Sequence, residues 1–139
     1  MASQTNKMKA IQNAAALADK LKQVFVTTAD SDGLPHVAAA GKMRLASNER
    51  VEVSSWFCPG TVTNLQHNRR ISLVVWDAVE DTGYQLVGEV EKVEESAFLN
   101  GYAPEEETSS SLPQVERQLL VRVDKVIGFS QDPHSDVEE

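Results

Sequence analysis

Cysteine is almost absent from this chain, because Cys58 is the single one in 139 residues. One cysteine closes no intrachain disulfide and builds no zinc cage, so we expect a reducing compartment, the cytoplasm, and no structural metal. Long apolar runs are also missing, and the opening residues, MASQTNKMKAIQ, lack the hydrophobic core of a secretion signal. We therefore expect no membrane segment and no membrane partner.

Basic side chains are scarce as well. Thirteen lysines and arginines face 21 acidic residues, which gives a formal net charge of −8. This charge has the wrong sign for a protein that holds nucleic acid through its phosphates. With 41% hydrophobic residues, the chain has enough apolar material for one core. We expect a single domain over residues 1–139.

The chain then divides by its residue patterns. Residues 8–23 have the spacing of an amphipathic helix, within an N-terminal segment 1–23, and Thr61 opens a short helix over 61–67 after Pro59 and Gly60. Extended runs separated by turn residues predict six strands over 24–29, 34–40, 51–57, 71–76, 84–93 and 119–129, with a bend or bulge at Gly88.

The residue patterns of the remaining segments predict turns, loops and short helices. Residues 44–47 lead into a turn at 48–50, residues 94–102 look helical, 103–111 form an acidic loop, and a short helix restarts at Leu112. The barrel would end at residue 129, and an acidic tail over 130–139 would be loose from Asp132 onwards. Short antiparallel strands with hairpin spacing favour a closed or nearly closed small β-barrel with flanking helices, because closure removes exposed sheet edges.

Two short stretches are candidates for binding. Gly60 and Thr61 lie where a strand, a turn and a helix start follow one another, and a helix N-terminus attracts anions such as phosphate. The alternative is an ordinary turn in which Thr61 caps its own helix. Ala38, Ala39 and Ala40 leave space on a strand for a flat ligand, or else they face a tightly packed helix or subunit.

The histidines and tryptophans carry no clear chemistry. His36, His67 and His134 have no metal-ligand spacing, so we interpret them as solvated or capping residues. We expect Trp56 and Trp76 either to stack on a ring or to fill a dimer interface.

Residues 24–93 resemble the FMN-binding split β-barrel family typified by pyridoxamine 5'-phosphate oxidase, and in particular its small members. Three motifs in the same order carry the resemblance: T-x-D-x-x-G-x-P-H over 28–36, N-L-x-x-N-x-R-x-S-L over 64–73, and G-E-V over 88–90. The resemblance implies a mainly β fold, a six-stranded antiparallel split barrel of Greek-key type. It also implies a homodimer with FMN at each end of the shared interface.

Carried over by position, the resemblance implies a set of cofactor-binding residues. Strand two would contribute Ala38, Ala39, Ala40 and Lys42; strand three would contribute Ser54, Ser55 and Trp56; and the phosphate would meet Gly60, Thr61 and Asn64. Tyr84 or Gln85 would reach across from the neighbouring subunit. No catalytic side chain is implied.

The chain departs from the family at the phosphate. Family members usually carry a lysine, or an arginine and a lysine, at the positions matched here by Pro59 to Thr61, and this chain has neither. Lys42 or Arg44 would have to supply the cation, or backbone amides alone would suffice. The substrate-binding pattern of the oxidase is also not visible near the C-terminus, so oxidation of pyridoxamine phosphate itself is not expected.

The leading hypothesis is therefore an FMN-binding flavoprotein that acts as a small flavin-dependent oxidoreductase with a small-molecule redox partner. The alternative is a non-enzymatic or differently loaded module on the same barrel, which holds haem, a deazaflavin or a small metabolite. A purely structural dimer is the third possibility.

Overall fold

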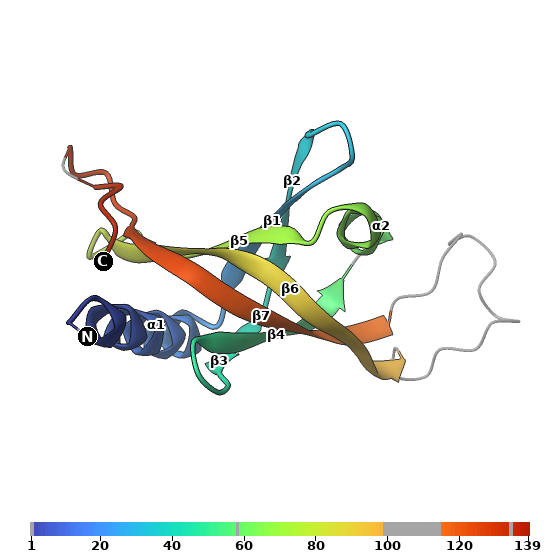
Figure 1. Ribbon diagram of the computed structural model, residues 1–139, viewed down its shortest axis with the longest axis horizontal. Coiled ribbons are helices and arrows are strands. Elements are labelled where there is room, and N and C mark those ends of the chain that lie inside the picture. The colour runs from blue at the N-terminus through green and yellow to red at the C-terminus, as the bar shows by residue number, and fades with distance from the viewer. Residues whose placement is uncertain (1, 58, 99–114, 134) are drawn as a thin grey trace, which may run out of the picture.

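The computed structural model describes residues 2–57, 59–98, 115–133 and 135–139 (Figure 1). Two helices and seven strands follow one another along the chain. Their bounds are α1 Ala2–Leu21, β1 Val24–Ala29, β2 Pro35–Ala40, β3 Lys42–Leu45, β4 Arg50–Phe57, α2 Pro59–His67, β5 Arg70–Asp77, β6 Thr82–Phe98 and β7 Val115–Gly128. No helix of these residues is long and apolar enough to cross a membrane.

All seven strands belong to one curled antiparallel sheet. Their order is β2-β1-β5-β6-β7-β4-β3, and β2 also contacts β4, which brings the two sides of the sheet together. In Figure 1, α1 lies beside the sheet at the end that holds both termini, and α2 lies towards the opposite end. The mainly β split-barrel fold with flanking helices is confirmed, with seven strands in place of the expected six.

The additional strand is β3. Its four residues pair with residues 51–54 of β4, and Gly41 alone separates it from β2. We expected residues 44–47 to lead into a turn. Because Met43 is the only buried residue of β3, the segment has too little alternation to identify a strand before β4 is placed beside it.

The long strand β6 corrects a second expectation. Residues 94–98 continue β6 and do not form a helix, because they pair with β7 through Phe98 and Val115. The rest of that predicted helix, the loop over 103–111 and the helix restart at Leu112 lie outside the described residues. The irregularity expected at Gly88 is confirmed, since the register of β6 and β7 shifts between Val87 and Gly88.

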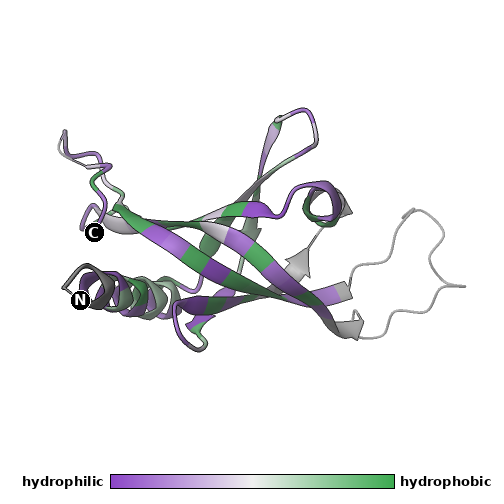
Figure 2. Ribbon diagram, viewed as in Figure 1, coloured by the Kyte–Doolittle hydropathy of each residue, from purple (hydrophilic) through white to green (hydrophobic). Residues whose placement is uncertain are grey.

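The core lies between α1 and the inner face of the sheet. Alternate residues of the strands are buried, and Figure 2 shows the matching bands of hydrophobic and hydrophilic residues along β6 and β7. From α1, Ile11, Ala14 and Ala18 join this core. The small alanines let the helix approach the sheet closely.

The C-terminal tail is not loose, contrary to our expectation. The backbone N–H of Gly128 donates to the carbonyl oxygen of Val137 at 2.9 Å, and that of Glu139 donates to Val126 at 2.8 Å. Ile127 and Glu138 form an isolated antiparallel bridge. Backbone pairing of this kind does not depend on the acidic side chains, which is why composition did not reveal it.

Candidate functional site

Helix α2 begins at Pro59, two residues before the predicted start at Thr61. Proline is favoured at the first helical position because its missing N–H is not needed there. A helix leaves its first N–H groups without intrahelical partners, and in α2 these include the amide of the exposed Gly60. The positive end of the α2 dipole therefore lies at Gly60, which is exposed.

The imidazole of His36 lies against this first turn. A Cβ built on Gly60 would be 3.5 Å from Nε2 of His36. The other ring nitrogen, Nδ1, is buried and has no hydrogen-bond partner in the part of the chain that the structure describes. A buried polar atom without a partner costs free energy, so a group that supplies the missing hydrogen bond would be bound favourably.

Two side chains fix α2 next to His36. Nδ2 of Asn64, one helical turn after Gly60, donates to Oγ1 of Thr28 on β1 at 3.0 Å. Thr28 is buried and pairs directly with His36 across β1 and β2. Asn64 thus holds the helix at a defined position relative to the imidazole.

The alanines of β2 do not share one face. Side chains alternate along a strand, so Ala38 lies on the same face as His36, whereas Ala39 lies with the exposed Val37 on the other face. Ala40 is buried in the core. Of the three alanines, only Ala38 is half-buried, and it lies two residues from His36 on the same face of β2.

The cations considered for the phosphate lie elsewhere in this chain. Lys42 and Arg44 line a cavity of about 510 Å³ between α1 and β3, together with Asp19 and Lys22. Gly60 is not part of that cavity. Nη2 of Arg44 also lies 3.5 Å from Oε2 of Glu52, with which it forms an ion pair.

The other predicted residues are distributed as follows. Ser54 is half-buried on β4 and pairs with Lys42, while Ser55 and Trp56 belong to the same strand and their side chains are outside the description. The side chain of Thr61 is completely buried. Tyr84 packs against the core, and Nε2 of Gln85 donates to Oγ of Ser72 at 2.7 Å.

The structure therefore brings together His36, Gly60, Asn64 and Thr28, and places Ala38 on the same face of β2 as His36. Our interpretation of the sequence did not select His36. It stands in the T-x-D-x-x-G-x-P-H motif, which was the available signal, but its importance depends on the packing of α2 against β2. No cluster of three or more potential metal ligands occurs among the described residues.

A curled antiparallel sheet with two flanking helices places the chain in the class of split β-barrels. Comparison with protein families narrows the class: the model described as pyridoxamine 5'-phosphate oxidase matches residues 10–124. The chain belongs to this FMN-binding split-barrel family. No curated protein sequence matches the chain.

Solved structures show the same fold at low sequence identity. HupZ of Group A Streptococcus is 17% identical, with a TM-score of 0.63 over 91% of this chain and 97% of that protein. An FMN-binding protein of Syntrophomonas wolfei is 14% identical, with a TM-score of 0.62 over 92% and 91%. A protein named F420 reductase is 14% identical, with a TM-score of 0.56 over 80% and 93%.

Proposed function

We propose that this protein is an FMN-binding flavoprotein, a small flavin-dependent oxidoreductase that does not oxidise pyridoxamine phosphate itself. The observation that carries the proposal is the imidazole of His36, whose Nε2 faces Gly60 in the first turn of α2 and whose buried Nδ1 has no hydrogen-bond partner among the described residues. The presence of only one cysteine in the chain supports a cytoplasmic location for the protein.

The residues at this helix end fit the phosphate of FMN. The amide of Gly60 and the dipole of α2 attract an anion, and the glycine has no side chain to keep a phosphate away from the backbone. The imidazole of His36 adds a hydrogen-bonding group where the family usually has a lysine or an arginine. Thr61 follows Gly60 in this turn and is itself completely buried.

The flavin ring would lie along β2 and β4, near Ala38, Ser54, Ser55 and Trp56. When bound, FMN supplies the electron-transfer chemistry. The residues of the chain hold and orient the ring and exclude water, and no side chain has to act as an acid or a base. A small-molecule redox partner would approach the exposed face of the ring.

We further propose that the protein forms a homodimer through the outer face of β1, β2 and β5. Val37 on this face is 61% exposed. Phe25 and Val74 pair across β1 and β5 and are only half-buried. Such a surface is apolar enough to be covered by a second copy, from which Tyr84 or Gln85 would reach the flavin.

Light scattering after gel filtration tests the dimer. We expect the mass of two chains for the wild type and of one chain for Val37→Glu, because the new carboxylate would be desolvated in the interface. Val79→Glu adds the same charge at a residue that is 94% exposed in another part of the molecule, so it should remain dimeric. A monomeric wild type would contradict the proposed dimer.

A second candidate is a module of the same fold loaded with haem, a deazaflavin or a small metabolite. The sequence Pro59-Gly60-Thr61 favours it, because no lysine or arginine is present to bind a phosphate. The structural relative named F420 reductase is consistent with a deazaflavin ligand on this barrel.

Titration of the purified protein with FMN, FAD and haemin separates the two candidates. The flavoprotein proposal predicts a saturable change of FMN fluorescence and an absorption spectrum with flavin bands. Saturable binding of haemin without binding of FMN would establish the second candidate. Binding of none of the three would contradict the flavoprotein proposal.

A further inference from the structure

A second cavity, of about 260 Å³, lies against a different face of α2 from the one that contacts His36. It is bounded by α2 and by the neighbouring parts of β6 and β7. Its lining residues are Thr61, Val62, Leu65, Gln66, Arg69, Val93, Arg117 and Leu119. No residue lines both this cavity and the cavity between α1 and β3, so the two cavities are separate.

The floor of the cavity is apolar and well packed. Leu65 on α2 is 4% exposed and Leu119 on β7 is 1% exposed, so these side chains are packed between the helix and the sheet. Val93 on β6 is 38% exposed and lies at the mouth. An apolar group of a ligand would leave water on entering this space, which is favourable in proportion to the area buried.

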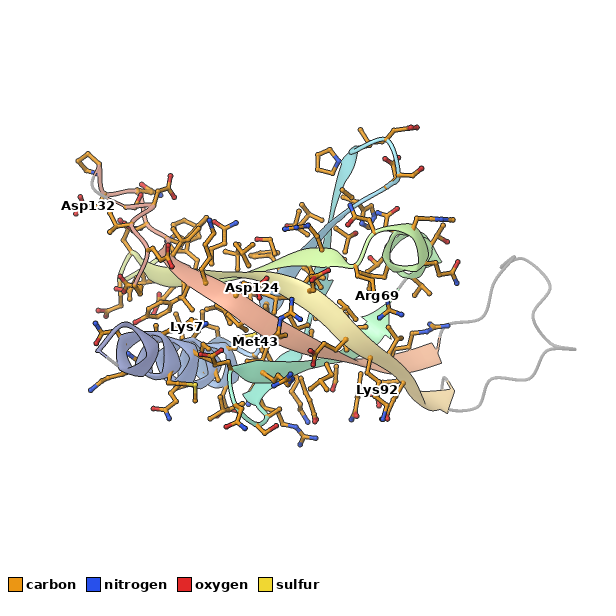
Figure 3. All side chains as sticks on the ribbon, in the orientation of Figure 1. Lys7, Met43, Arg69, Lys92, Asp124 and Asp132 are labelled. Carbon is orange, nitrogen blue, oxygen red and sulfur yellow. The ribbon has the colours of Figure 1, made fainter. Side chains whose placement is uncertain are left out.

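Arg69 gives the cavity a positive side. Its Nη1 donates to the carbonyl oxygen of Val90 on β6 at 3.0 Å, which holds the guanidinium between α2 and the sheet (Figure 3). A guanidinium has five N–H donors, and this bond uses one of them. Nε and Nη2 of Arg69 have no partner among the described residues, so they can meet an anion in two parallel hydrogen bonds.

The charge of this cavity differs from that of its surroundings. The chain has a formal net charge of −8, and three other cavities among the described residues, of about 510, 170 and 400 Å³, are each lined by at least one carboxylate. Among the described residues, the cavity below α2 is lined by Arg69 and Arg117 and by no acidic side chain. The guanidinium of Arg69 therefore offers an anion a local positive charge, although the molecule as a whole repels anions.

We propose that this cavity binds a small monocarboxylate with a short hydrocarbon body. The carboxylate lies on the guanidinium of Arg69, and the hydrocarbon lies over the floor formed by Leu65 and Leu119. The volume equals that of about nine water molecules, at roughly 30 Å³ each, so the occupant has about ten non-hydrogen atoms. Octanoate has this size and serves as the probe.

Binding of octanoate to the full chain is measured by calorimetry and by amide NMR shifts. We expect saturable binding, with shifts concentrated at lining residues such as Leu65, Val93 and Leu119. Octan-1-ol, which has the same body and no charge, should bind at least about tenfold more weakly. Absence of saturable octanoate binding, or equal affinity for the alcohol, would overturn the proposal.

Two neighbouring arginines provide a matched pair of variants. Arg69→Gln should weaken octanoate binding by at least about tenfold, because a charge-assisted bond is lost. Arg70→Gln removes the same charge at a residue that does not line the cavity, and it should bind within about twofold of wild type. Equal effects of both variants would mean that octanoate responds only to net charge.

A third variant covers the case in which Arg69→Gln fails to fold after losing its bond to Val90. Val93→Glu places a carboxylate at the partly exposed mouth of the cavity, so it should weaken octanoate and leave octan-1-ol little changed. Val79→Glu is the control for added charge. Unchanged octanoate binding by Val93→Glu would place the ligand elsewhere. No flavin takes part in these measurements, so their outcome is independent of FMN binding.

Discussion

The two ends of the barrel differ in whether their polar groups have hydrogen-bond partners within the chain. At the turn between β5 and β6, Oδ1 of Asp77 accepts hydrogen bonds from the backbone N–H groups of Val79 and Glu80 at 3.0 and 3.3 Å. The Oδ2 atom of Asp77 also lies 3.4 Å from Nζ of Lys20. In the same turn, Asp81 accepts from the indole N–H of Trp76 at 3.0 Å.

The α2 end holds a buried Nδ1 of His36 without a protein partner among the described residues, and a cavity that faces Arg69. Polar groups that are satisfied within the chain rigidify it, whereas groups left open can be satisfied by a ligand. We infer that the β5–β6 end stabilises the fold and that the α2 end binds a ligand. Substitutions should therefore separate stability from binding.

Gly83→Ala at the β5–β6 end should have the largest effect. A Cβ at this position would lie 2.5 Å from the carbonyl oxygen of Val75 and 2.9 Å from that of Phe129. Backbone would have to move, so we expect the free energy of unfolding to fall by about 3 kcal/mol, measured by urea denaturation.

Gly41→Ala is the control for this substitution. A Cβ on Gly41 meets no atom within 4 Å, so the expected change is within about 0.5 kcal/mol. Similar losses for both variants would show that the close backbone approach at Gly83 is not what makes glycine necessary there.

His36→Leu at the α2 end should have a smaller effect of opposite sign. It removes a buried nitrogen that lacks a partner, so the free energy of unfolding should rise by about 1 kcal/mol in the ligand-free protein. His67→Leu, at an exposed position in the last turn of α2, should change it by less than about 0.5 kcal/mol. A marked loss of stability in His36→Leu would indicate that Nδ1 is already satisfied.

Acid should affect the β5–β6 end through Asp77. Hydrogen bonds from the backbone N–H of Glu80 and, less strongly, of Val79, together with the ammonium of Lys20, lower the pKa of this carboxyl below its ordinary value. A lowered pKa in the folded state contributes stability above the ordinary carboxyl pKa of about 4, and this stability is lost as the pH falls further.

The urea midpoint of the wild type should therefore fall between about pH 5 and pH 3, and it should fall less steeply in Asp77→Asn. Identical slopes would show that Asp77 does not contribute to the acid sensitivity. This effect is the smallest of the three, since other carboxylates titrate in the same range.

Local patterns were sufficient for much of the barrel. The bounds of β1 are those predicted, β4 begins one residue earlier, and β5 is longer by one residue at each end, because the buried faces of β1 and β5 alternate regularly. The patterns failed where pairing with a distant strand decides the structure. Residues 94–98 have helix-forming residues but continue β6 along β7.

The candidate site was predictable in part. The sequence predicted a helix start next to Pro59 and Gly60, and in the structure these two residues form the first turn of α2 itself. The role of His36 was not predictable, because it depends on α2 packing against β2. The separation of Lys42 from Gly60 also follows from tertiary structure, since β3 packs against α1.

The central claim is that the α2 end holds the phosphate of FMN through His36 and the amide of Gly60. Titration of wild type and His36→Leu with FMN and with riboflavin, which lacks the phosphate, tests it directly. The wild type should bind FMN at least about tenfold more tightly than riboflavin, and the variant should bind the two within about twofold of each other. Equal affinities in the wild type, or an undiminished preference for FMN in the variant, would contradict the claim.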